Sequence, residues 1–198
     1  MESDKKSWLR AFLLWGSRGM FAAGIVLLSL VGAATLQAKL YQDRAKQLIQ
    51  SEIHGSSAGR IVVPATSIKE NDILGRLDIP RIGISLVVLE GTDSRTLRLG
   101  AGHIETTSLP GEGGNVGIAG HRDTFFRPLR DIRKNDRIQI QTAMGLFQYQ
   151  VDWMKVVSPE DVSVLAPSDR SVLTLVTCYP FQFFGSAPKR FIVRAHRY

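Results

Sequence analysis

The sequence predicts an all-β domain that follows an N-terminal membrane anchor, and three observations lead to this fold class. First, an apolar N-terminal segment leaves about 150 of the 198 residues, enough for one hydrophobic core but not for two. Second, short β-prone runs separated by glycine, proline and polar turn residues fill the chain from residue 73 onward. Third, helical and strand patterns do not alternate in this region. Together these observations predict a β-sandwich or a closed β-barrel.

Seven runs carry the strand pattern: residues 73–79, 82–89, 116–119, 137–142, 146–157, 171–177 and 191–195. The turn sequence Ala143-Met144-Gly145 predicts a hairpin between two of these runs. Only brief helical turns are expected in the domain, near residues 93–97 and 125–130. The folded domain is therefore expected to consist almost entirely of strands and turns.

The apolar N-terminal stretch predicts a transmembrane anchor over residues 20–38, which carry no charge and come close to the roughly 20 residues that a spanning helix needs. Four lysine and arginine residues precede it, so the positive-inside rule predicts that residues 1–19 are cytoplasmic and the folded domain extracytoplasmic. A cleaved signal peptide is the competing interpretation, because small residues occur at positions 32–34. The length of the apolar stretch and the lack of a clean A-x-A site favour the uncleaved anchor.

Residues 39–71 are interpreted as a stalk and linker before the folded domain of residues 72–198. Apolar residues at helical spacing predict a short stalk helix over residues 40–53. Residues 54–59 are expected to break this helix, and the following stretch to Asn71 has the mixed composition of a linker.

Charge and cysteine content narrow the function classes. The formal net charge of +7 suits a membrane or wall surface, since the basic residues are scattered and no nucleic-acid-binding motif occurs. No nucleic-acid partner is therefore expected. A single cysteine, Cys178, excludes an intramolecular disulfide.

Cys178 ends an apolar β-prone run, and Arg190 follows it by twelve residues, beyond a loop that contains proline and glycine. If the two flanking runs are neighbouring antiparallel strands, Cys178 and Arg190 face each other across the mouth of this loop. A thiolate nucleophile with an oxyanion partner has this pattern. A small buried hydrophobic residue is the alternative interpretation of Cys178.

A cysteine nucleophile usually works with a histidine, and the chain has four. His54 lies in the linker and His196 lies next to the C-terminus, so both are poor candidates. His121 directly follows the run 116–119, and a rigid strand would present it at the rim of a barrel. His103 remains an alternative, although turn residues surround it and less would fix it in place.

Three motifs, in this order, resemble the sortase family of membrane-anchored cysteine transpeptidases: G-N-V-G-I-A-G-H-R at 114–122, T-L-V-T-C at 174–178, and A-P-K-R-F-I-V at 187–193. The sequence Y-P-F after the cysteine and the short C-terminus most resemble class D. The resemblance implies an eight-stranded β-barrel, one strand more than the pattern alone shows. It also implies that Cys178 is the nucleophile, His121 the acid and base, and Arg190 the oxyanion stabiliser, with Thr177 helping to shape the substrate site.

The resemblance further implies cleavage of an L-P-x-T-G-like sorting signal between threonine and glycine, a thioacyl-enzyme, and transfer of the acyl group to an amine. The implied partners are secreted proteins with a C-terminal sorting signal and an amine acceptor on cell wall or pilin. We predict no cofactor and no metal, because the spacing of the loop acids matches no calcium-binding loop.

Two alternatives stay open at this stage. Another envelope cysteine enzyme, an L,D-transpeptidase or a peptidase, would place the thiol in a different context: S-x-G-C-x-R in the first, or on a helix before the histidine in the papain type. Here His121 precedes Cys178. The second alternative is a non-catalytic, membrane-tethered β-barrel binding module in which Cys178 is inert.

Overall fold

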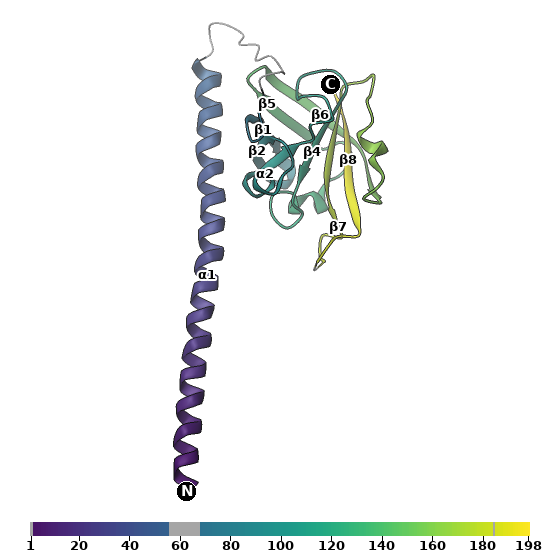
Figure 1. The fold of residues 1–198 in the computed structure, drawn as a ribbon. Coiled ribbons are helices and arrows are strands. Elements are labelled where there is room, and N and C mark those ends of the chain that lie inside the picture. The colour runs from purple at the N-terminus through teal and green to yellow at the C-terminus, as the bar shows by residue number, and fades with distance from the viewer. Residues whose placement is uncertain (1, 56–67, 184) are drawn as a thin grey trace. The chain divides into compact units, whose positions relative to one another are not determined.

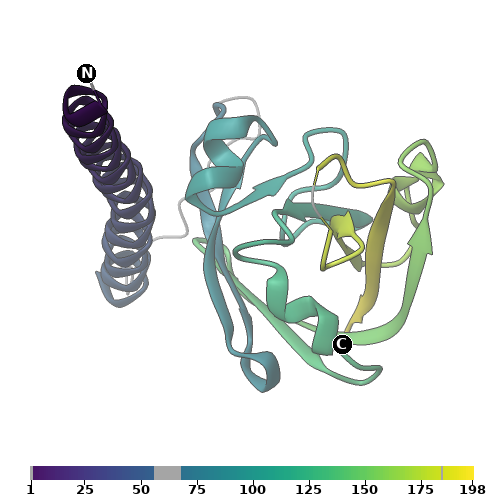
Figure 2. The same ribbon diagram turned by 90° about the horizontal axis from the view of Figure 1, so that it is seen from below.

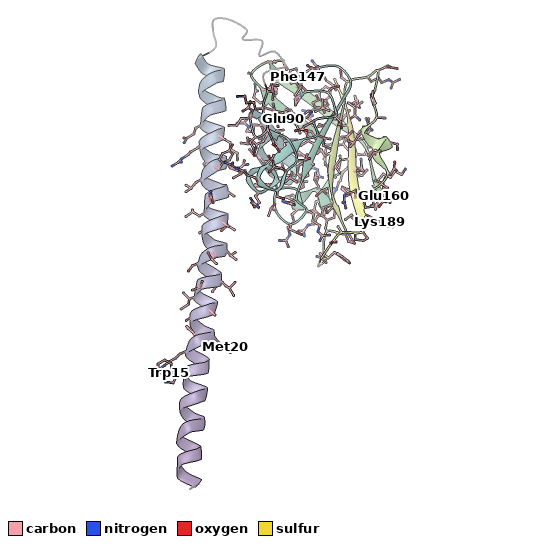
Figure 3. All side chains as sticks on the ribbon, in the orientation of Figure 1. Trp15, Met20, Glu90, Phe147, Glu160 and Lys189 are labelled. Carbon is pink, nitrogen blue, oxygen red and sulfur yellow. The ribbon has the colours of Figure 1, made fainter. Side chains whose placement is uncertain are left out.

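The computed structural model describes residues 2–55, 68–183 and 185–198, in two units, residues 1–40 and 41–198. One helix, α1, spans Glu2–Gly55. Its segment Trp15–Gln47 is long and apolar enough to cross a membrane, and the side chains of Trp15 and Met20 are exposed (Figure 3). The predicted anchor and stalk thus form one continuous helix, since no proline interrupts them. Most of the predicted linker lies outside the described residues.

The predicted all-β domain is confirmed as a closed barrel of eight strands in the order β1-β2-β3-β4-β7-β8-β6-β5 (Figures 1 and 2). Antiparallel pairing of β1 with β5 closes the ring, so the strands leave no long unpaired edge. The strands are β1 Ile73–Ile79, β2 Ile84–Glu90, β3 Ala101–His103, β4 Asn115–Gly120, β5 Arg137–Thr142, β6 Gly145–Val157, β7 Val172–Tyr179 and β8 Lys189–Arg197.

Each of the seven predicted runs forms a strand, and the bounds of β1 and β5 match the prediction. The eighth strand is β3, whose residues the sequence pattern had assigned to turns. It has only three residues, too few for a detectable alternation, and it exists because it pairs in parallel with β2 and antiparallel with β4.

The two predicted helical turns are confirmed as the helix α2, Ser94–Leu99, and the 3-10 helix η3, Arg127–Asp131. Asp93 caps α2 through a hydrogen bond from the Arg95 N–H, 2.6 Å long. Two further 3-10 helices, η2 at Pro80–Ile82 and η4 at Val162–Leu165, were not predicted.

The inward-facing side chains of the strands fill the barrel, as the period of two along a strand requires. The largest fully buried side chains include Leu77, Ile79, Ile118, Phe126, Ile138, Ile140, Tyr149, Leu173 and Leu175. The barrel interior is therefore a packed core, and chemistry must take place at its ends or on its outer face.

Four segments meet at one end of the barrel. Strand β4 runs parallel to β7, β7 runs antiparallel to β8, and β8 runs antiparallel to β6. The carboxyl ends of β4, β7 and β6 therefore lie beside the amino end of β8. Glu160 and Lys189 mark this end in Figure 3, and Phe147 marks the opposite end.

Candidate active site

The backbone register places three predicted site residues in one row across the sheet. In the β4–β7 pair Gly120 lies opposite Thr177. His121 directly follows Gly120 and Cys178 directly follows Thr177, so the backbones of His121 and Cys178 are also neighbours. In the β7–β8 pair Cys178 lies directly opposite Arg190. With neighbouring strands about 4.8 Å apart, the backbone of His121 and that of Arg190 flank Cys178 within about 10 Å of each other.

Cys178 and Arg190 share the outer face of the barrel. Leu173 and Leu175 point into the core, and alternation along β7 sends Cys178 to the opposite face. Residues directly opposite each other in an antiparallel pair point to the same face, so Arg190 accompanies it. Both residues are half-buried.

Thr177 points the other way, into the barrel, and is 2% exposed. Its hydroxyl donates a 2.7 Å hydrogen bond to the carbonyl oxygen of Gly120. This bond ties β7 to β4 one residue before Cys178 and one residue before His121. The structure therefore places Thr177 where it fixes the spacing of the row.

His121 is exposed and begins a tight turn. Its carbonyl oxygen accepts a 3.0 Å hydrogen bond from the Phe126 N–H, which fixes the backbone where β4 ends. The ring of Phe126 packs against Gly120 so closely that a Cβ there would lie 2.7 Å from it. Glycine at position 120 therefore allows the turn to fold over the core and hold His121 outside it.

His103 has a different environment from the one expected. It lies in β3 and is 1% exposed, with its Nδ1 2.9 Å from a carboxylate oxygen of Glu90 and its Nε2 3.0 Å from the carbonyl oxygen of Ser108. The hydroxyl of Thr107 also lies 3.2 Å from Nε2. Both ring nitrogens are thus engaged inside the fold, away from the row of Cys178.

Arg190 is oriented by its own loop. Its Nη1 donates to the carbonyl oxygens of Ala187 and Lys189, at 3.2 and 3.1 Å. Its charge also reaches the neighbouring β6–β7 loop: a hydrogen bond from Ser158 lowers the pKa of Glu160, and Arg190 lowers it further. The side chain of Arg190 thus has a fixed orientation, at the strand position opposite Cys178.

The β6–β7 loop is held against the outer face by Asn115, which starts β4 and is 2% exposed. Its amide nitrogen donates to the carbonyl oxygens of Val164 and Ala166, at 3.1 and 3.0 Å. The hydroxyl of Thr174, two positions before Val176 on β7, donates to the Asn115 amide oxygen. This network covers one part of the outer face of β7 and leaves the part that carries Cys178 open.

Within the described residues, no group of three or more histidine, cysteine, aspartate or glutamate side chains is arranged to hold a metal ion. Asp123, two positions after His121, is 69% exposed and accepts a 3.3 Å hydrogen bond from Arg122. The candidate site is the row of Cys178, His121 and Arg190, at three neighbouring strand ends.

Comparison with known proteins identifies the family. The family model of the sortase domain matches residues 77–198. Sortase D of Bacillus subtilis (strain 168) is 38% identical over 124 residues, which are 62% of this chain and 63% of that protein. Sortase A of Listeria monocytogenes is 28% identical over 122 residues, 60% of this chain and 54% of that protein. The chain therefore matches less than two thirds of the length of these relatives.

Solved structures agree with the sequence comparison. A Clostridium perfringens Sortase D5 transpeptidase superposes with a TM-score of 0.65 at 30% identity, over 81% of this chain and 97% of that one. Clostridium perfringens sortase C with the C-terminal cell wall sorting motif gives a TM-score of 0.62 at 29% identity, over 79% of this chain and 86% of that one. Since the family model covers the barrel from within β1 to the C-terminus, the chain belongs to the sortase family.

Proposed function

We propose that this protein is a membrane-anchored cysteine transpeptidase in which Cys178, His121 and Arg190 perform the chemistry. The row that these residues form across β4, β7 and β8 is the observation that carries the proposal. The proposal assigns the roles of nucleophile, proton carrier and permanent cation to these three neighbouring positions, as acyl transfer through a thioester requires.

In the first half-reaction the thiolate of Cys178 attacks the carbonyl carbon of the peptide bond between threonine and glycine in the sorting signal. The C–N bond then breaks, and the departing nitrogen takes a proton from the His121 imidazolium. The products are a thioester on Cys178, a free amine and a neutral imidazole. His121 is exposed, so its imidazolium is accessible to the leaving amine at the rim of the barrel.

In the second half-reaction an amine of the acceptor attacks the thioester carbonyl. Neutral His121 takes the proton that this nitrogen loses, the C–S bond breaks, and the sulfur leaves as a thiolate. A new amide links substrate and acceptor, and the starting protonation states are restored. No cofactor enters the balance.

Arg190 stabilises the negative charge that develops on the carbonyl oxygen in both halves. A guanidinium stays protonated throughout and donates two parallel hydrogen bonds in one plane, which an ammonium does not. Its contacts to the carbonyls of Ala187 and Lys189 use only its Nη1. Thr177 contributes by tying β7 to β4 beneath the site, so that the thiol keeps its distance from His121.

The substrates we infer are secreted proteins with a C-terminal L-P-x-T-G-like signal, and the acceptor is an amine on cell wall or pilin. The solved relative with a cell wall sorting motif supports this substrate class. The long apolar helix and the basic residues before it support a single membrane span with a cytoplasmic N-terminus and an extracytoplasmic domain over residues 72–198.

The test is intact-mass analysis of the full chain in detergent micelles with a pool of L-P-x-T-G-like peptides. We expect one adduct, equal in mass to a peptide cut after threonine, which is absent from Cys178→Ala and disappears when a small amine is added. A thiol that reacts with an alkylating reagent but forms no adduct with any peptide would contradict the proposal and favour the non-catalytic binding module.

A further inference from the structure

Arg122 follows His121 directly and is almost fully buried, with 6% of its surface exposed. Arginine is rarely buried unless its charge is paired, and the carboxylate near it, that of Asp123, is 69% exposed at 3.3 Å. Such a pair contributes little, because water screens it. The burial of Arg122 therefore needs another explanation.

The guanidinium of Arg122 donates to three backbone carbonyls of the loop that follows Cys178. Its Nη1 lies 2.9 Å from the Pro180 oxygen, and its Nη2 lies 2.7 Å from the Phe183 oxygen and 3.2 Å from the Gly185 oxygen. The ring of Phe183 covers it, with 5.7 Å from the ring centroid to Cζ. The planar fork of one arginine thus gathers three acceptors that are up to five residues apart in sequence.

Backbone hydrogen bonds do not fix the conformation of the described residues of this loop, which is defined as residues 180–183 and 185–188. Between these described residues, or from them to the rest of the described chain, there is no backbone–backbone hydrogen bond. Its start is held by packing of the Phe181 ring against Phe191, with centroids 5.2 Å apart. Beyond Phe181, the polar contacts to the described loop backbone come from Arg122, at Phe183 and Gly185, and from Arg190, at Ala187.

The loop in turn orients Arg190. The carbonyl oxygen of Ala187, at its far end, and that of Lys189, the first residue of β8, accept from Nη1 of Arg190. A continuous set of contacts therefore runs from Arg122 to the loop and from the loop to Arg190. Arg122 also directly follows His121. It therefore links the segment that carries His121 to the loop that contacts Arg190.

We propose that Arg122 is a positioning residue that holds the β7–β8 loop beside Cys178 in the conformation that accepts the sorting signal. The inference rests on the proposed transpeptidase function for its kinetic consequence. Without the three hydrogen bonds the loop samples other conformations, and only a fraction of molecules is ready to bind. Apparent affinity falls by that fraction, while bound substrate restores the loop, so the loss appears mainly in KM.

The experiment compares full-length wild type, Arg122→Met and Arg122→Lys, with Arg130→Met as the matched control. Arg130 lies in η3, is 47% exposed and pairs only with the adjacent Asp131 in the described structure, at 3.4 Å. Peptide cleavage gives kcat and KM, chymotrypsin cleavage after Phe181 or Phe183 reports the open loop, and thermal unfolding reports global stability. Chymotrypsin needs no substrate, so this measurement is independent of the proposed function.

For Arg122→Met we expect KM to rise about tenfold with kcat within about threefold of wild type, and loop cleavage to accelerate about tenfold. Arg122→Lys should give KM and loop-cleavage values between those of wild type and Arg122→Met, since an ammonium reaches fewer of the carbonyls. Arg130→Met should match wild type. Parental KM and parental loop cleavage in Arg122→Met would overturn the inference, as would a lower melting temperature with no change in either.

Two outcomes separate this inference from the proposed function. If wild type cleaves no peptide, the transpeptidase proposal fails, and accelerated loop cleavage in Arg122→Met still supports the role of Arg122 in holding the loop. If Arg122→Met does not fold, Arg122→Lys decides: intermediate loop cleavage supports the inference, and parental cleavage overturns it.

Discussion

Cys178 in β7 lies directly opposite Arg190 in β8, and both side chains emerge on the outer face of the barrel. The pairing of two long strands fixes this relationship, since the register runs without interruption from Val172 opposite His196 to Tyr179 opposite Lys189. A one-residue slip would send Cys178 to the core. The sheet therefore fixes the backbone positions of Cys178 and Arg190 relative to each other.

Replacement of the thiol tests the nucleophile. Cys178→Ala removes one half-buried sulfur from a strand position, so we expect the free energy of unfolding to change by about 1 kcal/mol or less. Acyl-enzyme formation and transfer should both fall to background. Intact mass and a product assay measure the two steps, and adduct formation by the variant would place the nucleophile elsewhere.

Alanine substitutions of His121 and His103 are expected to affect different properties, the first the catalytic rate and the second the stability of the fold. His121→Ala should unfold like the wild type but lose about 10²–10⁴ in kcat, because an exposed acid and base is missing. His103→Ala should destabilise the fold by about 3–5 kcal/mol, since it leaves the buried Glu90 carboxylate without its partner. Denaturant unfolding and kcat separate these effects. An inactive, stable His103→Ala beside an active His121→Ala would reverse the assignment.

Arg190→Lys separates charge from geometry. Lysine keeps the positive charge but loses the planar fork, so we expect normal folding and a loss of about 10²–10³ in kcat, with KM little changed. Arg122→Met should show the reverse division between kcat and KM. A lysine variant with a near-parental rate would transfer the oxyanion role to backbone N–H groups near Cys178.

Acid stability depends in part on Asp136. Burial by itself would raise the pKa of its carboxyl group, but hydrogen bonds from the Arg81 side chain and the Arg133 N–H outweigh burial and hold the pKa below its ordinary value. Because the folded-state pKa lies below the unfolded value of about 3.9, this stabilisation is present above that pH and is lost as the pH falls through the folded-state pKa.

We therefore expect Asp136→Asn to lower the free energy of unfolding at pH 7 by about 1–2 kcal/mol, a modest figure because Arg81 is 40% exposed. The difference from wild type should shrink below about pH 4. Urea unfolding at a series of pH values measures it. A constant difference down to pH 2 would show that the carboxylate charge does not contribute.

Membrane topology is expected to follow the basic residues before the apolar helix. Protease added outside spheroplasts should degrade the barrel, residues 73–198, and leave the N-terminal segment protected. An N-terminal and a C-terminal epitope tag report the two sides, and lysed spheroplasts serve as the control. Protection of the C-terminal tag in intact spheroplasts would reverse the orientation and separate the enzyme from exported substrates.

The all-β class, seven of the strands and the long apolar helix could be predicted from the sequence, and the candidate site residues were proposed from it. These features are readable because they are local: alternation along a strand, a charge-free stretch and turn residues each depend on neighbours in the chain. The position of Cys178 opposite Arg190 also followed from sequence, since two adjacent strands joined by one loop have a predictable pairing.

Other features depend on segments that are distant in sequence, so they became visible only in the folded structure. Strand β3 forms because β2 and β4 supply its hydrogen bonds, and its three residues carry no pattern of their own. His103 is engaged inside the barrel because Glu90 and Ser108 are brought to it by folding. In the sequence Arg122 is only the last residue of the motif at 114–122, and its contacts arise only where the β7–β8 loop, about 60 residues later, places three carbonyls around it. Hydrogen bonds between such remote groups leave no periodic trace in the sequence.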